Sequence, residues 1–116
     1  MQKIPSITPK QANTSYLSDN FVVLDVREQD EHNFVQIDRT LHVPMSQIPL
    51  NIKNLPKDKK IGVLCHHGNR SLQVTAYLIN KGFDATNIEG GIERWALEVD
   101  PSLKRYNRVF GRISQI

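Results

Sequence analysis

The chain has 116 residues, of which 39% are hydrophobic and 23% charged, so it is long enough for one globular domain and too short for two. No apolar run reaches the roughly 18–20 residues of a membrane span, and residues 1–5 lack the apolar stretch of a secretory signal, which together predict a cytoplasmic protein without a membrane partner. The single cysteine excludes a disulfide within the chain, and the absence of a second ligand pair near it argues against a zinc site.

Short apolar runs alternate with segments of helical spacing, which predicts an α/β fold of βα units around a mostly parallel sheet. Residues 3–7 fit a short first strand, and Thr8 followed by Pro9 fits the start of a helix. The run 21–26 is almost continuously apolar and rich in valine, so we expect a central strand buried on both faces. The polar segment 28–34 predicts a short helix.

The middle of the chain predicts two more strands. Residues 41–43 fit a short strand that ends at Pro44, and Ser46 is a candidate cap for a helix running to residue 55. The apolar run 61–64 predicts a second buried strand that leads directly into Cys65.

Two helices and one strand are expected after that cysteine. We expect a helix over 71–80 with Leu72, Ala76 and Ile79 on its inner face, terminated by Lys81 and Gly82. Residues 83–88 predict the last strand of the sheet. A final amphipathic helix should then begin at residues 90–91, and its expected buried residues are Ile92, Trp95 and Ala96.

The C-terminal segment differs from the rest in charge. All 12 acidic residues precede Pro101, whereas residues 101–116 carry four cations, Lys104, Arg105, Arg108 and Arg112. We interpret 1–106 as the domain and 107–116 as a basic C-terminal tail, with little order expected beyond Pro101. A solvated tail is the first interpretation, and docking to an acidic partner is an alternative. Nucleic acid is not favoured, since four cations alone are a weak signal for it. Deletion after Tyr106 should accordingly spare the chemistry.

The loop 65–71 carries the candidate chemistry. Cys65 follows a buried strand and precedes a helix expected to begin near Arg70 and Ser71, which is where open α/β sheets bind ligands. Unpaired N–H groups at a helix N-terminus favour an anion, Gly68 permits a tight curl, and Arg70 adds a cation. These features favour the thiolate of Cys65 and predict a nucleophile that carries sulfur as a persulfide.

Other members of the loop have two possible roles. His66 and His67 could contact substrate or act as acids, or they could contribute only backbone N–H groups while their rings face solvent. Ser71 could hydrogen-bond the sulfur or only cap the helix.

The sequence resembles the single-domain rhodanese (thiosulfate sulfurtransferase) family over about residues 4–106. Three segments carry the resemblance in the right order: LDVRE at 24–28, CHHGNRS at 65–71 and EGGIERW at 89–95. The sequence EVDP at 98–101 reinforces it.

The resemblance implies a single rhodanese-like domain, a five-stranded, mostly parallel sheet flanked by helices on both faces. It also implies a sulfurtransferase that moves sulfur from a donor such as thiosulfate or a persulfide to a thiol, which could belong to a protein, or to cyanide. No metal or organic cofactor is implied. We expect a monomer or weak dimer.

The resemblance also assigns roles to residues. Cys65 and Arg70 are implied to be catalytic. The residues implied to bind substrate are His66, His67, Gly68, Asn69 and Ser71. Asp25 and Arg27 are interpreted as a structural charge pair near the loop. The segment VQIDRT at 35–40 departs from the family's usual Gly-His-Ile-x-Gly-Ala, and we expect a changed loop path there.

Several other functions remain open from the sequence. A cysteine phosphatase would place five residues between its cysteine and arginine, whereas four separate Cys65 from Arg70. A non-catalytic persulfide carrier or a partner-binding module would keep the same loop. Redox sensing would lack a second cysteine in this chain to resolve a sulfenic acid.

Overall fold

A computed structural model describes residues 3–116; Met1 and Gln2, which begin the segment inspected for a signal sequence, lie outside the described residues. The helices and strands are, in chain order, β1 (Ser6–Ile7), α1 (Pro9–Tyr16), β2 (Phe21–Asp25), α2 (Gln29–Phe34), β3 (Leu41–His42), the 3-10 turn η1 (Met45–Gln47), α3 (Ile48–Asn51), the 3-10 turn η2 (Ile52–Asn54), β4 (Lys60–Leu64), α4 (Asn69–Asn80), β5 (Ala85–Ile88), α5 (Gly91–Glu98), β6 (Tyr106–Val109) and β7 (Arg112–Gln115).

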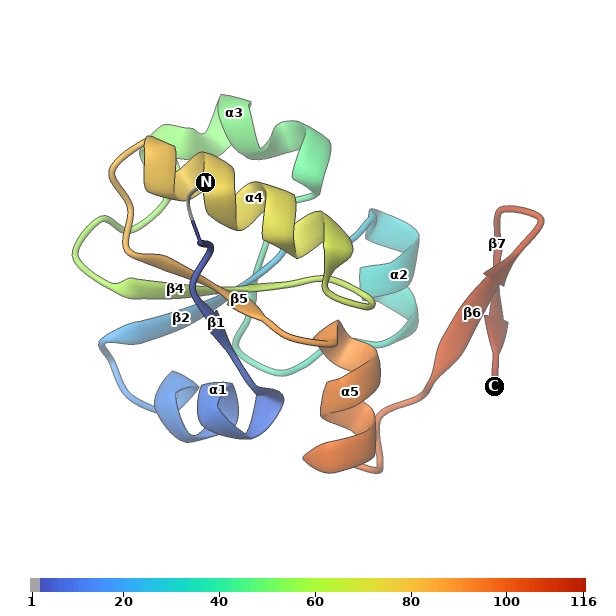
Figure 1. Cartoon of the computed structure of the whole chain (residues 1–116). Helices are drawn as coiled ribbons and strands as arrows, with labels where there is room; N and C mark the ends of the chain where they lie inside the picture. Colours follow the sequence, from blue (N-terminus) through green and yellow to red (C-terminus); the bar gives the residue numbers. More distant parts are fainter. Residues whose placement is uncertain (1–2) are drawn as a thin grey trace.

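Five strands form one parallel sheet in the order β1-β5-β4-β2-β3 (Figure 1). Helices α3 and α4 cover one face, and α1 and α5 cover the other (Figure 1). The expected five-stranded α/β fold is therefore confirmed. Within the described residues 3–116, no helix combines the length and the apolar character that a membrane crossing requires.

Alternation along the strands divides the core into two layers. In β2, Leu24 packs in the layer under α4, whereas Phe21 and Val23 pack in the layer over α1 and α5. Cys65, which follows β4, shares the α4 layer. The long buried runs of β2 and β4 were predicted because strands covered on both faces are apolar at successive positions.

Two helix ends and one buried helix face follow from local sequence. The Thr8 side chain accepts a hydrogen bond from the N–H of Gln11, and Gln11 returns one to the N–H of Thr8, which confirms the predicted cap. Helix α4 ends at Asn80 and is capped by Lys81, which is followed by Gly82 with a φ of 90°. In α5 the residues expected to be buried, Ile92, Trp95 and Ala96, are buried.

Two details of the predicted helices are wrong. Ser46 lies inside the turn η1 and Pro44 precedes that turn, so the serine does not cap a continuous helix. Leu72 is 40% exposed, because the inner face of α4 is made by Ser71, Val74, Thr75 and Leu78.

The expectation of little order beyond Pro101 is also wrong. Strands β6 and β7 form an antiparallel hairpin that stands beside α2 and α5 (Figure 1). The two turn residues, Phe110 and Gly111, have φ of 50° and 78°, the conformation that tight two-residue hairpins require. The division into 1–106 and 107–116 cuts this hairpin after its first residue, and it stays a prediction about domains.

The segment 35–40 adopts a strained conformation at one residue. Arg39 occupies a position where the resembled family usually has glycine, and its φ of 62° is in the left-handed region. A non-glycine residue there costs about 1–2 kcal/mol. At Arg39, then, the chain keeps a backbone conformation typical of glycine despite the side chain.

Candidate active site

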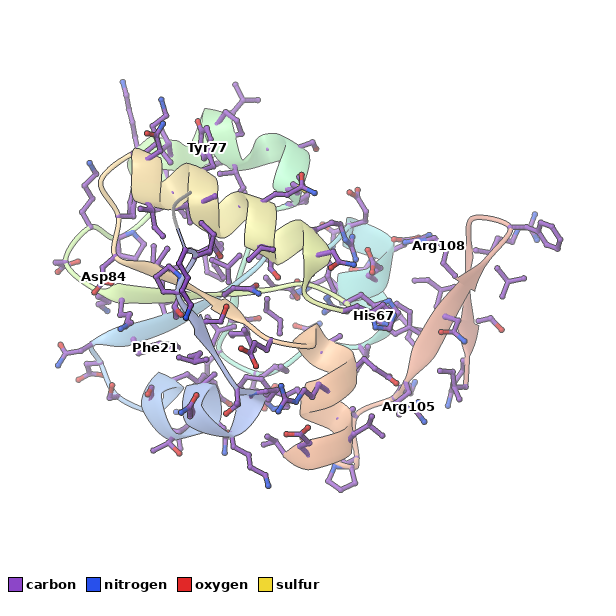
Figure 2. All side chains as sticks on the ribbon, viewed as in Figure 1. Phe21, His67, Tyr77, Asp84, Arg105 and Arg108 are labelled. Carbon is purple, nitrogen blue, oxygen red and sulfur yellow. The ribbon has the colours of Figure 1, made fainter. Side chains whose placement is uncertain are left out.

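A cleft of about 640 Å³ opens at the carboxyl end of β4, between the loop 65–69, helix α2 and the hairpin. It is lined by Glu28, Gln29, Asp30, Glu31, Cys65, His66, His67, Asn69, Arg70 and Arg108. This is the edge of an open α/β sheet at which ligands bind. In Figure 2, Arg108 marks the hairpin side of this region and His67 marks the loop.

Cys65 lies at the floor of the cleft, and only 1% of the residue is exposed. Its Sγ accepts a hydrogen bond from the backbone N–H of Gly68 at 3.1 Å. The Cys65 thiol donates to Ser71 Oγ at 3.2 Å, and Ser71 Oγ donates in turn to Asn87 Oδ1 at 2.6 Å. Of the two roles that the sequence left open for Ser71, the structure shows the hydrogen bond with the sulfur, whereas the contact with Asn87 on β5 was missed.

The loop curls around the sulfur because Gly68 adopts a φ of 102°, a conformation that side chains rarely allow. Gly68 immediately precedes α4, so the helix begins at Asn69, slightly earlier than predicted. The N-terminus of this 12-residue helix therefore lies beside the sulfur, where its dipole favours an anion.

Helix α5 fixes the other side of the loop. The N–H groups of Ile92 and Glu93 donate to the carbonyl oxygens of Cys65 and His66 at 2.9 and 3.1 Å. Because the carbonyl and the N–H of a trans peptide point in opposite directions, the N–H groups of His66 and His67 point away from α5. The loop carbonyls are thereby bound by the helix and kept away from the sulfur.

Arg70 does not stand as a free cation in the loop. Its Nη1 and Nη2 donate to Glu31 Oε1 and Oε2 at 2.8 and 2.9 Å. This bidentate pair raises the pKa of Arg70. Sequence reasoning missed Glu31, which is separated from Arg70 by 39 residues and gave no signal beyond its position in the predicted helix 28–34.

Asp25 and Arg27 form the expected charge pair, and both side chains are fully buried. Arg27 donates to Asp25 from Nε and Nη2, to Tyr106 Oη and the Glu31 carbonyl from Nη1, and to the Val35 carbonyl from Nη2. Burial raises the pKa of Asp25, but the hydrogen bonds and charge of Arg27 outweigh burial and leave that pKa below its ordinary value. The pair is linked to the site through the bonds of Arg27 to the Glu31 carbonyl and the Tyr106 hydroxyl.

The hairpin supplies two residues that sequence reasoning placed at the edge of the domain or outside it. Tyr106 is 1% exposed, and its hydroxyl donates to Glu31 Oε2 at 2.8 Å. Arg108 lines the cleft and donates to both carboxylate oxygens of Asp30 at 3.0 Å. The interpretation of the C-terminal segment as a solvated tail is therefore wrong at these positions.

The two loop histidines occupy different environments. His67 is exposed, whereas the ring of His66 stacks on Tyr106 with centroids 3.9 Å apart and an interplanar angle of 7°. Burial and the neighbouring His67 lower the pKa of His66 to about 4, so its ring is neutral near pH 7. Among the described residues 3–116, His66 Nε2 has no hydrogen-bond partner. Asn69 is exposed on the cleft wall.

Acid is expected to destabilise the fold through His66. Its folded pKa of about 4 lies below the ordinary 6.5, so the unfolded chain binds the proton first as the pH falls. This contribution to stability is complete above pH 6.5 and decreases between 6.5 and 4. In urea unfolding of the wild type, the free energy of unfolding should fall by about 2 kcal/mol between pH 7.5 and 5 because of this group.

His66→Phe provides the comparison, because it keeps a ring that can stack on Tyr106 and removes the titrating group. The variant should lose about 2 kcal/mol less than the wild type over the same interval. Equal losses in the two proteins would contradict the assignment of this acid sensitivity to His66.

Comparison with known proteins gives one consistent result. The family profile described as "Rhodanese-like domain" matches residues 8–98. The chain is 32% identical over 96 residues to "Thiosulfate sulfurtransferase GlpE" of Pseudomonas syringae pv. syringae (strain B728a), covering 82% of this chain and 90% of that protein. It is 33% identical over 92 residues to a "Sulfurtransferase" of Allochromatium vinosum, covering 78% and 82%. A rhodanese-related protein from Thermoplasma volcanium superposes with a TM-score of 0.77 at 35% identity, covering 82% of this chain and 93% of that one.

Proposed function

The chain belongs to the rhodanese-like domain family, and on that basis we propose that it is a sulfurtransferase that carries sulfur as a persulfide on Cys65. The donor would be thiosulfate or a persulfide, and the acceptor a thiol or, in an assay, cyanide. The observation that carries the proposal is the position of Cys65 Sγ. This atom lies at the floor of the cleft and accepts a hydrogen bond from the N–H of Gly68.

In the first step, the Cys65 thiolate attacks the outer sulfur of thiosulfate. A bond forms between Sγ and that sulfur, the sulfur–sulfur bond of thiosulfate breaks, and its electron pair leaves with sulfite. The products are the Cys65 persulfide anion and sulfite, so charge and sulfur atoms balance. The N–H of Gly68 and the N-terminus of α4 support the anion on the enzyme.

In the second step, an acceptor thiolate attacks the outer sulfur of the persulfide. The new persulfide leaves on the acceptor, and the electron pair of the broken bond returns to Cys65 Sγ as thiolate. Ser71 Oγ lies 3.2 Å from Sγ and donates its own hydrogen to Asn87, so it accepts a hydrogen bond from the Cys65 thiol when the thiol is protonated. Arg70 lines the same cleft, and its pair with Glu31 occupies two of its five N–H donors, which leaves three to bind an anionic donor.

Intact mass spectrometry tests the proposal. Incubation with thiosulfate followed by desalting should add about 32 Da, one sulfur atom, together with release of sulfite. Dithiothreitol should remove that mass, because a persulfide is reducible by a thiol whereas a sulfinic acid of nearly the same added mass is not.

Cys65→Ala is the control, since the chain has no other cysteine. The variant should gain no mass and release no sulfite. The proposal fails if the wild-type mass stays unchanged with thiosulfate and with a small-molecule persulfide, or if the variant gains the same reducible increment.

A further inference from the structure

We propose that Tyr106, at the start of the C-terminal hairpin, is a positioning residue that orients Arg70 toward the anionic substrate of Cys65. The inference rests on the proposed sulfur transfer and extends the site beyond residue 98, where the family match ends. Tyr106 does not itself line the cleft, and it acts through two residues that do, Glu31 and His66.

The first contact that supports this role is made by the Tyr106 hydroxyl. It donates to Glu31 Oε2 at 2.8 Å and accepts from Arg27 Nη1 at 3.1 Å. Glu31 is only 1% exposed, and both of its carboxylate oxygens accept from Arg70. Burial raises the pKa of Glu31, but the hydrogen bonds from Arg70 and Tyr106 outweigh burial and hold that pKa at about 2. The carboxylate thus stays ionised and fixed between the tyrosine and Arg70.

The second contact is made by the Tyr106 ring. It stacks on His66, the residue immediately after the nucleophile. One side chain therefore touches both the loop beside Cys65 and the carboxylate that holds Arg70. Its burial among the core residues over α1 and α5 gives it a rigid position from which to do so.

Ion pairs on both sides of Tyr106 hold the hairpin in place. Arg105 donates to Glu93 on α5 at 2.6 Å, and Arg108 donates to Asp30 on α2 at 3.0 Å. Arg105 and Arg108 are two of the four cations in residues 101–116 that sequence reasoning assigned to a basic segment. Asp30 lines the cleft, and α5, which carries Glu93, bonds the carbonyls of Cys65 and His66, so the hairpin is anchored to two elements that hold the site.

Alkylation of Cys65 by two reagents of different charge tests the inference without any sulfur donor. Iodoacetate is an anion and iodoacetamide is neutral, so the ratio of their rates reports how well a cation is oriented toward the sulfur. In Tyr106→Phe this ratio should fall by about threefold or more, while the iodoacetamide rate stays within about twofold of wild type. This substitution keeps an aromatic ring that can stack on His66 and removes only the hydroxyl.

Steady-state kinetics provide the second measurement. Because Arg70 would bind the donor, Tyr106→Phe should raise the KM for thiosulfate by about fivefold or more and change kcat by less than about twofold. Arg112→Gln, an exposed substitution on β7, is the matched control and should leave both alkylation rates and both kinetic constants unchanged.

The inference is overturned if Tyr106→Phe leaves the iodoacetate-to-iodoacetamide ratio unchanged. An unchanged ratio in which both alkylation rates rise together would describe a loop that is loosened without regard to the charge of the reagent. These results are independent of whether thiosulfate sulfurates the wild type. A normal alkylation pattern with no sulfuration would contradict the proposed function alone.

Discussion

Replacing Asp25 with alanine is expected to lower the free energy of unfolding by about 3–5 kcal/mol, because it leaves the Arg27 guanidinium buried without its counter-ion. Both side chains have no exposed area, and Asp25 accepts three side-chain contacts from Arg27 within 3.2 Å. The free energy of unfolding of a domain of this size is about 5–15 kcal/mol in total, so much of its stability depends on this pair. Urea unfolding at pH 7 measures the loss.

Two further variants make that measurement specific. Asp30→Ala removes the acid of an exposed pair with Arg108 and should cost at most about 1 kcal/mol. Asp25→Ala combined with Arg27→Met removes both buried charges and should be more stable than Asp25→Ala alone. A loss in Asp25→Ala no larger than that in Asp30→Ala would show that burial of the pair has been overstated.

Gly91→Ala is expected to damage both stability and sulfur transfer. A Cβ at this residue would collide with backbone atoms of Cys65 and His66, and its φ of 61° is strained for alanine. Since the loop backbone would have to move, we expect a loss of about 3 kcal/mol in stability. The same movement should displace the loop from α5 and lower kcat/KM for sulfite release by about tenfold or more.

Gly90→Ala is the matched control for this variant. Its φ of 74° carries similar strain, and the three atoms nearest to the added Cβ belong to the Arg94 side chain and not to the loop 65–71. We therefore expect Gly90→Ala to lose stability to a degree comparable with Gly91→Ala, about 3 kcal/mol, and to keep most of its activity. Equal losses of activity in the two variants would contradict the view that contact between Gly91 and the loop orients the site.

The sheet could be predicted from sequence because its signals are local. The runs that became β2 and β4 are apolar at successive residues, and the cap made by Thr8 lies within three residues of its partner Gln11. The nucleophile was found for the same reason, since strand, loop and helix follow one another within a few positions around Cys65.

The inner face of α4 was predicted incorrectly because two of its buried residues are polar. Ser71 bonds to Asn87, and Thr75 donates to the Ser71 carbonyl at 2.7 Å, so both are satisfied without water. An apolar pattern therefore pointed to Leu72, which faces outward. Polar residues that serve the site replaced the hydrophobic stripe expected of a core helix.

The contacts around Arg70 could not be predicted, because they join residues distant in sequence. Tyr106 lies 75 residues from Glu31, and neither residue belongs to a pattern that identifies the other. The hairpin was missed because its turn has Phe110 at a position where asparagine or aspartate is the usual signal.

The hairpin also has a consequence for how the molecule opens. Its two strands pair only with each other in the sheet, and apart from Tyr106 and the partly buried Ile113 its anchoring side chains form ion pairs, which are individually weak. Such a unit can detach in a local opening that leaves the parallel sheet intact, at a smaller free energy than global unfolding. Peptide bonds near Phe110, whose side chain is fully exposed, would then be cut by proteases under fully native conditions while the sheet resists cleavage.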